Sequence, residues 1–394
     1  MIDHMTSRDR MLGSIEGSEV DYIPCSFMLF FNMSNKFGKV ESIEEEVNLG
    51  LDAVVNVGTL EHYFSECIKI KEWKENENGF VYFYRNIKTP AGDLNQKIVQ
   101  WNNWPSEDHF PIFDDYIIPR AKEVLVKPEE DLEKLKYFFG PIGNREIKKL
   151  KEEAAVSKKI AEKHRLLQVA GEIGRNLFNE KKYSLIMGAD AMSWLSGFEN
   201  IMILSLSKPE IIGEYAKIIN DWNIRQIEVY LNHTDVDLIV RRGWYETTEF
   251  WTPGIYKMII APTIKKEADL IHKAGKKFGY IITSAFLPII DSILDTGIDV
   301  LIGIDPVEGK GTDLDIIKEK FLNKKRALWG GVSGPMTIEN GTEFEVVEAT
   351  KKALELLGKS GGFILSPVDN VREETENVWR NTYKFIETWG EFRR

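Results

Sequence analysis

Four short apolar runs in the second half of the chain decide the fold. They are Lys277-Phe-Gly-Tyr-Ile-Ile-Thr283, Val300-Leu-Ile-Gly-Ile304, Ala327-Leu-Trp329 and Gly362-Phe-Ile-Leu365. Segments with apolar residues at helical spacing separate them, namely Phe286–Thr296, Thr312–Phe321 and Thr342–Leu357. Strand-length runs that alternate with helices predict βαβ units and a parallel sheet.

The first half continues this alternation less regularly. We expect strands at Tyr22–Phe31, Leu51–Val57, Leu166–Ala170, Leu185–Met187 and Val236–Val240, and helices at Ile43–Leu49, Asn144–Lys163, Ala191–Leu206 and Pro209–Asn232. No repeat or low-complexity linker interrupts the series. The sequence therefore predicts one α/β domain over residues 1–394, a (β/α)8 TIM barrel.

Residues 67–101 have a different pattern. Ile68–Trp73, Phe80–Asn86 and Gln96–Trp101 have β character, and turns rich in Asn, Gly and Pro separate them. We predict a small β insertion after the second strand of the barrel.

Local signals mark several helix ends. Thr342 and Glu345 have the spacing of a capping box at a helix start. Gly275, Gly297 and Gly358 each follow a predicted helix, where a left-handed residue is expected.

Composition excludes several classes of protein. The 394 residues carry a formal charge of −11, so nucleic acid and anionic membranes are not expected partners. Two cysteines, Cys25 and Cys67, cannot make a disulfide framework, and we expect both to be buried thiols. No apolar run has the length of a membrane helix, so we expect a cytoplasmic protein.

Function in such barrels lies where the strands end at their carboxyl side. The run Arg241-Arg-Gly-Trp-Tyr-Glu246 follows a predicted strand and is the most informative of these ends. Tyr245 could donate a proton to a leaving oxygen, with Glu246 orienting it, and Arg241 or Arg242 could bind an anion. Because neighbours on a strand face opposite sides, Arg242 and Tyr245 are the better site candidates. The alternative is a structural ion pair with Asp235, Asp237 or Asp305.

The other predicted strand ends supply further candidates. Those for substrate binding are Met28, Phe30, Trp244, Thr283, Asp305, Trp329, Asp369 and Asn370. Asp305 and Asp369 could equally cap the loops that follow their strands. No metal motif is present, so the metal candidates, Glu246, Asp305, Asp369 and His62, are weak. Tryptophans gathered at the mouth would favour an aromatic ligand.

Both ends of the chain resemble the uroporphyrinogen decarboxylase superfamily. The resemblance rests on Thr6-Ser-Arg-Asp-Arg-Met-Leu12, Asp21-Tyr-Ile-Pro24, Glu339–Glu348 and Gly361-Gly-Phe-Ile-Leu-Ser-Pro367. It implies a (β/α)8 barrel and a place beside the decarboxylase and the corrinoid-linked methyltransferases. The thiol methyltransferases of this superfamily carry a His-x-Cys…Cys zinc site. Here Ile281, Thr283 and Asp369 stand at those positions, so that site is absent.

The decarboxylase is also a poor match. Its arginine-rich segment after the first strand corresponds here to the apolar run Phe27–Met33, so porphyrinogen decarboxylation is not expected. Arg241–Pro253, Trp329-Gly-Gly331 and Ser366–Asn370 look like the substrate-side methyltransferases of anaerobic O-demethylases. The resemblance implies transfer of a methyl group from a methoxylated aromatic compound to the Co(I) corrinoid (cobalamin) of a partner protein. The resemblance also allows a zinc ion held by ligands other than cysteine, and it leaves open whether the protein forms a homodimer. The alternatives are another methyl donor, such as a methylamine or thioether, and a barrel that binds a small ligand without catalysis.

Overall fold

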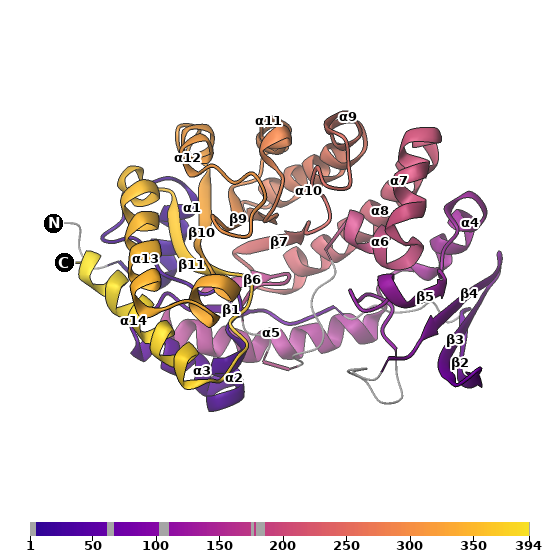
Figure 1. Ribbon diagram of the computed structural model, residues 1–394, viewed down its shortest axis with the longest axis horizontal. Helices are drawn as coiled ribbons and strands as arrows, with labels where there is room; N and C mark the ends of the chain where they lie inside the picture. Colours follow the sequence, from indigo (N-terminus) through magenta and orange to yellow (C-terminus); the bar gives the residue numbers. More distant parts are fainter. Residues whose placement is uncertain (1–4, 61–66, 102–109, 175–176, 179–185, 394) are drawn as a thin grey trace.

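The structure, a computed structural model, describes residues 5–60, 67–101, 110–174, 177–178 and 186–393. Within these residues, seven parallel strands form one curled sheet in the order β1-β6-β7-β8-β9-β10-β11 (Figure 1). The strands are β1 Val54–Asn56, β6 Leu167–Ala170, β7 Leu238–Arg242, β8 Lys277–Ile281, β9 Val300–Ile304, β10 Ala327–Ser333 and β11 Phe363–Val368. This confirms the predicted α/β barrel.

An extended segment near the N-terminus closes the sheet into a ring. Ser26 donates its backbone N–H to Leu365 of β11, and Leu365 in turn donates to Pro24. On the other side, Asp52, two residues before β1, donates its backbone N–H to Cys25. Pro24–Ser26 therefore takes the eighth position of the barrel, between β11 and β1.

Helices surround the ring. They are α1 Ser7–Ile15, α2 Phe31–Phe37, α3 Lys39–Asn48, α4 Pro128–Phe138, α5 Asn144–His164, α6 Ala189–Ser196, α7 Phe198–Ser207, α8 Pro209–His233, α9 Pro253–Ile255, α10 Ala261–Lys273, α11 Ile290–Asp295, α12 Leu314–Leu322, α13 Glu343–Leu357 and α14 Glu376–Phe392. The predicted capping box of Thr342 and Glu345 is present at the start of α13.

Two apolar layers follow from strand alternation. Val240, Ile302 and Trp329 belong to a cluster inside the ring, together with Met11 and Ile15 of α1. α1 thus fills the end of the ring at which the strands begin. The alternate residues, such as Ile239 and Tyr280, pack outward against the helices.

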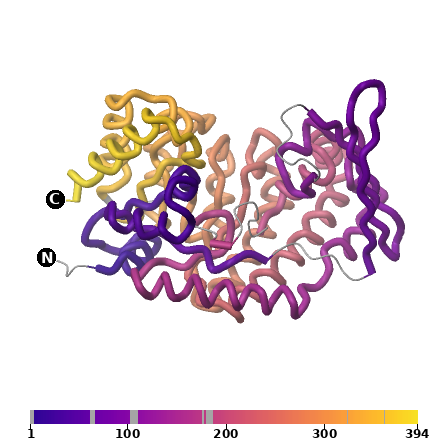
Figure 2. Tube along the Cα trace, turned by 90° about the horizontal axis from the view of Figure 1, so that it is seen from below, coloured from indigo at the N-terminus to yellow at the C-terminus, as the bar shows by residue number. Residues whose placement is uncertain are grey.

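The insertion forms a separate antiparallel sheet. β2 Lys69–Glu77, β3 Phe80–Thr89 and β4 Gly92–Val99 pair in sequence order, and β5 Ala121–Glu123 adds to β4. This sheet lies at one end of the molecule, and both termini lie at the other end (Figures 1 and 2). The predicted insertion is confirmed and gains a fourth strand from beyond its expected boundary.

Other boundaries differ from the prediction. The run Tyr22–Phe31 is not one strand, because α2 begins at Phe31, and Gly197, with φ of 74°, divides the helix predicted over Ala191–Leu206. Gly275 and Gly297 have positive φ, whereas Gly358 does not; Gly361 adopts that conformation instead. Cys67 is exposed rather than buried. None of the described helices is long and apolar enough to cross a membrane.

Candidate active site

The two arginines at the end of β7 point to opposite sides of the barrel wall. Arg241 faces outward, where Nη2 donates to Glu246 Oε1 at 2.5 Å and Nη1 donates to Glu267 Oε1 at 2.6 Å. All three side chains are at most 1% exposed. Burial opposes the charge of Arg241, but both carboxylates raise its pKa well above the usual value. Arg241 is therefore a structural cation in this geometry.

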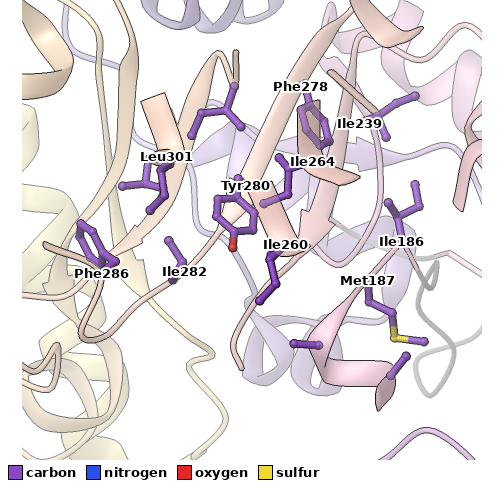
Figure 3. Packing of buried hydrophobic residues seen from close by; sticks show 14 of the residues in the cluster. Ile186, Met187, Ile239, Ile260, Ile264, Phe278, Tyr280, Ile282, Phe286 and Leu301 are labelled. Atoms are coloured by element: carbon purple, nitrogen blue, oxygen red, sulfur yellow. The ribbon is translucent and has the colours of Figure 1, made fainter. Parts of the chain in front are cut away.

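Further side chains complete this outer network. Tyr280 on β8 donates its hydroxyl to Glu246 Oε2 at 2.8 Å, and Asn220 and Asn223 of α8 each donate to Glu267 Oε1 at 2.8 Å. Figure 3 shows Tyr280 among the apolar side chains of the outer layer, with Ile260 and Ile264 nearby. A Cβ atom on Gly188 would overlap both Arg241 and Glu246, so a larger residue there would have to displace this buried pair.

Arg242 faces the mouth of the barrel. Its Nε donates to Asp190 Oδ1 at 2.8 Å, and its Nη1 donates to Glu172 Oε1. Nη2 lies 3.6 Å from Asp115 Oδ2, which is too long for a hydrogen bond. The guanidinium carbon lies 4.8 Å from the ring centre of Trp194 and 5.8 Å from that of Trp244. The side chain is 16% exposed, so it remains accessible.

Asp115 links Arg242 to Tyr245. Its Oδ1 accepts the Tyr245 hydroxyl and also the Trp194 Nε1–H, the latter at 2.8 Å. The ring of Tyr245 packs edge-on against Phe198 and Phe250, which stack on each other. The mouth therefore joins a phenol, a guanidinium and flat apolar surfaces.

Burial and charge shift the titration of these groups. Burial raises the pKa of Asp190 to about 7, although Arg242 opposes the shift. Burial and the hydrogen bond to Asp115 raise the pKa of Tyr245. Burial lowers and the surrounding carboxylates raise the pKa of Arg242, with a net increase. At neutral pH, Tyr245 is thus a neutral donor and Arg242 a fixed cation.

The sequence candidates divide between the mouth and the core. Trp244 and Thr283 are half-buried at the strand ends, and Trp244 donates to Glu172. Met28 and Trp329 are buried inside the ring, and Phe30 stacks on Phe27 in the outer core. The predicted orienting role of Glu246 does not fit its position, because Asp115 holds Tyr245 instead. The acids predicted as ion-pair partners of the two arginines are also not the ones observed. Asp237 pairs with Arg8, and Asp235 pairs with Lys158.

Asp305 and Asn370 make loop contacts. Asp305 Oδ1 accepts the backbone N–H groups of Val307 and Glu308, the capping alternative considered for it. Asn370 Oδ1 accepts the N–H of Phe31 at the start of α2. Asp369 is half-buried with φ of 65°, and burial raises its pKa.

The described donor set does not fit a zinc ion. Among the residues that the structure describes, no three His, Cys, Asp or Glu side chains form a group that could hold a metal. At the mouth, Glu172 and Asp190 accept hydrogen bonds from Arg242. His62 lies outside the described residues.

Sequence reasoning missed three carboxylates of the mouth. Glu172 follows β6 by two residues, so the strand-end rule applied to that strand would have found it. Asp190 is the second residue of α6, and Asp115 lies in the segment between β4 and β5. Asp190 lies three residues after the predicted strand Leu185–Met187, so the same rule would have pointed to it, whereas Asp115 does not directly follow any predicted strand of the barrel.

Comparison with known proteins supports the fold. No protein-family model matches the sequence, and a search of curated proteins finds no match. A solved methyltransferase from Methanosarcina mazei is similar in structure, with a TM-score of 0.61 and 16% identity, over 99% of this chain and 100% of that chain. A B12-independent methionine synthase from a Shewanella species has a TM-score of 0.39 and 10% identity, over 94% and 97%. At such identities the similarity to the first of these shows the fold alone.

Proposed function

We propose that this protein is a methyltransferase that moves a methyl group from an aryl methyl ether to the Co(I) corrinoid of a partner protein. The observation that carries the proposal is the joint placement of Tyr245 and Arg242 at the barrel mouth, linked through Asp115 and flanked by Trp194 and Trp244. The sequence resemblance and the name of the Methanosarcina structure support the same reaction class.

The chemistry requires help at the leaving oxygen. A reduced corrinoid on the partner protein would supply the electron pair for attack at the methyl carbon, and the electrons of the C–O bond would pass to the aryl oxygen. Tyr245 donates a hydrogen bond to that oxygen in place of Asp115, and the Arg242 guanidinium stabilises its negative charge. The phenolate then leaves and takes a proton from water. The raised pKa of Tyr245 keeps its hydroxyl protonated throughout.

The aromatic side chains at the mouth would hold the aromatic ring of the substrate. Trp194 and Tyr245 meet edge-on with ring centres 6.5 Å apart, and the ring centre of Trp244 lies 5.8 Å from the guanidinium carbon of Arg242. Aromatic rings favour such edge and offset contacts. A methoxylated ring placed against them would bring its ether oxygen toward Tyr245 and Arg242.

An anaerobic assay tests the reaction. The protein is mixed with a reduced corrinoid protein and methoxyphenols or methoxybenzoates, and both the loss of Co(I) absorbance and the release of phenol are followed. We expect methyl transfer in the wild type and a decrease on the order of 10²-fold for Tyr245→Phe. Glu355→Gln on the exposed face of α13 is the control and should leave the rate unchanged. Absence of transfer from every aryl methyl ether, with several corrinoid proteins, would contradict the proposal.

A further inference from the structure

The small sheet has a structural connection to the barrel mouth. Residues 110–117 run from the sheet toward the barrel and end just before a short helical turn, Ile118–Arg120, that leads into β5. We call residues 110–117 the strap. Its Asp115 is the residue that reaches Tyr245, Trp194 and Arg242.

The sheet anchors the strap at its start. Arg85 of β3 is 1% exposed and donates to the carbonyl oxygens of Phe110 and Pro111. Its guanidinium carbon also lies 3.9 Å from the ring centre of Phe110. Phe110 packs with Phe83 and Ile98 of the sheet. A buried arginine that binds two consecutive carbonyl groups fixes the direction in which the strap leaves the sheet.

The barrel anchors the strap two residues before Asp115. The ring of Phe113 lies within 6.4 Å of the ring centres of Phe138, Phe139, Trp194 and Trp222. Trp194 both contacts Phe113 and donates to Asp115. The carboxylate is therefore held at the mouth from two sides, although its side chain is 57% exposed.

We propose that Asp115 is a positioning and specificity residue of this site, and that the insertion holds it there. This inference rests on the proposed methyl transfer. Its Oδ1 accepts the Tyr245 hydroxyl, and it thereby orients this hydroxyl until the ether oxygen replaces the carboxylate as acceptor. Its charge adds to that of Glu172 and, above pH 7, to that of Asp190, and the three carboxyl groups surround the guanidinium of Arg242.

The charge predicts a substrate class. A ring that carries a carboxylate would bring a further negative charge beside Asp115, whereas a neutral methoxyphenol would not. Two like charges several ångström apart at a partly exposed site correspond to about a tenfold effect. The site therefore selects uncharged methoxylated phenols over methoxybenzoates.

Two variants separate charge from positioning. Asp115→Asn keeps an oxygen acceptor for Tyr245 but removes the charge, so it should lower KM for methoxybenzoates and abolish the preference of about tenfold. Asp115→Ala removes the charge as well, and should in addition lower kcat for both substrates, because Tyr245 loses the acceptor that orients its hydroxyl before the substrate binds. Arg85→Lys, at the other end of the strap, should also lower kcat, because a lysine cannot bind both the Phe110 and Pro111 carbonyl groups as Arg85 does. The control is again Glu355→Gln.

Binding of demethylated analogues tests the charge effect without turnover. Catechol and 3,4-dihydroxybenzoate are titrated while tryptophan fluorescence is followed, and catechol should bind about ten times more tightly. Selective binding without any methyl transfer would support the specificity and contradict the proposed reaction. Equal binding of the two analogues, no binding of either, or an unchanged preference in Asp115→Asn would overturn the role of Asp115.

Discussion

Arg241 and Arg242 are consecutive residues on β7, and each is surrounded by acidic side chains, yet they form two different kinds of site. Around Arg241 the acids are Glu246 and Glu267, all atoms are buried, and asparagines and Tyr280 complete the network. Around Arg242 the acids are Glu172, Asp190 and Asp115, and the last is exposed. The network around Arg241 is closed to solvent, and the network around Arg242 is open to solvent at Asp115.

The difference shows how consecutive residues of one strand can serve different purposes, Arg241 for stability and Arg242 for the candidate site. Alternation places Arg241 in the layer between sheet and helices, where a charge must be fully paired to be tolerated. It places Arg242 at the mouth, where one of its three acidic partners, Asp115, is exposed to solvent. The comparison yields four predictions, in order of decreasing effect on stability.

Removing the closed arginine should have the largest effect. Arg241→Met leaves Glu246 and Glu267 buried without a cation, which should cost about 3–5 kcal/mol of unfolding free energy. Urea denaturation measures it. Arg380→Met, which removes an exposed pair with Glu343 on α13, should cost less than about 1 kcal/mol. Equal losses of unfolding free energy in the two variants would mean that the buried network around Arg241 contributes no more to stability than an exposed ion pair.

The buried acid of the open network should govern pH dependence. Because the pKa of Asp190 rises from 3.8 to about 7 on folding, its contribution favours the folded state at low pH and is lost as pH increases through 7. Asp190→Asn should remove this loss, a change of up to ~4 kcal/mol between pH 4 and pH 8. Unfolding curves of both proteins across that range provide the test, and parallel pH profiles would contradict it.

Two tyrosines allow a matched comparison. Tyr280→Phe removes a donor from the fully buried Glu246 and should cost about 1.5–3 kcal/mol. Tyr245→Phe removes a donor from the exposed Asp115 and should cost about 1 kcal/mol or less, while it impairs methyl transfer. Thermal unfolding of the two variants measures both losses. A larger loss of stability in Tyr245→Phe than in Tyr280→Phe would contradict the assignment of the closed and open networks.

Arg242→Lys should have the smallest effect on stability. A lysine keeps the charge but cannot present the planar fork that reaches Glu172 and Asp190 together, so a loss of about 1 kcal/mol is expected. Methyl transfer should fall on the order of 10²-fold. Unfolding and the anaerobic assay are measured on the same preparation. A normal rate would show that the position of the charge, rather than the fork, is sufficient.

The sequence predicts the fold better than the site, for physical reasons. β8 to β11 are short apolar strands between amphipathic helices, and this period is visible locally. The apolar run before Met33 is continuous, so its change from extended chain to helix at Phe31 leaves no periodic signal.

Alternation predicts that Arg241 and Arg242 face opposite sides of the sheet, and the structure places Arg242, the preferred candidate, at the mouth. Its partners do not follow, because Glu172, Asp190 and Asp115 come from three separate segments that only the tertiary structure brings together. The burial of Glu246 could not be predicted either, because Glu246 lies in the loop after β7 and is enclosed by α6 and β8, from which Ala189 and Tyr280 donate hydrogen bonds to it.

Gly188 has a consequence for how this protein can diverge. A side chain at this position would occupy the space of the Arg241–Glu246 pair, so exchange of the glycine, the arginine or the glutamate alone should destabilise the fold. Homologous chains should therefore inherit the three residues as a set, or replace them together by an apolar combination. An alignment of relatives would show them as covarying positions, although Gly188 and Arg241 are 53 residues apart in the chain.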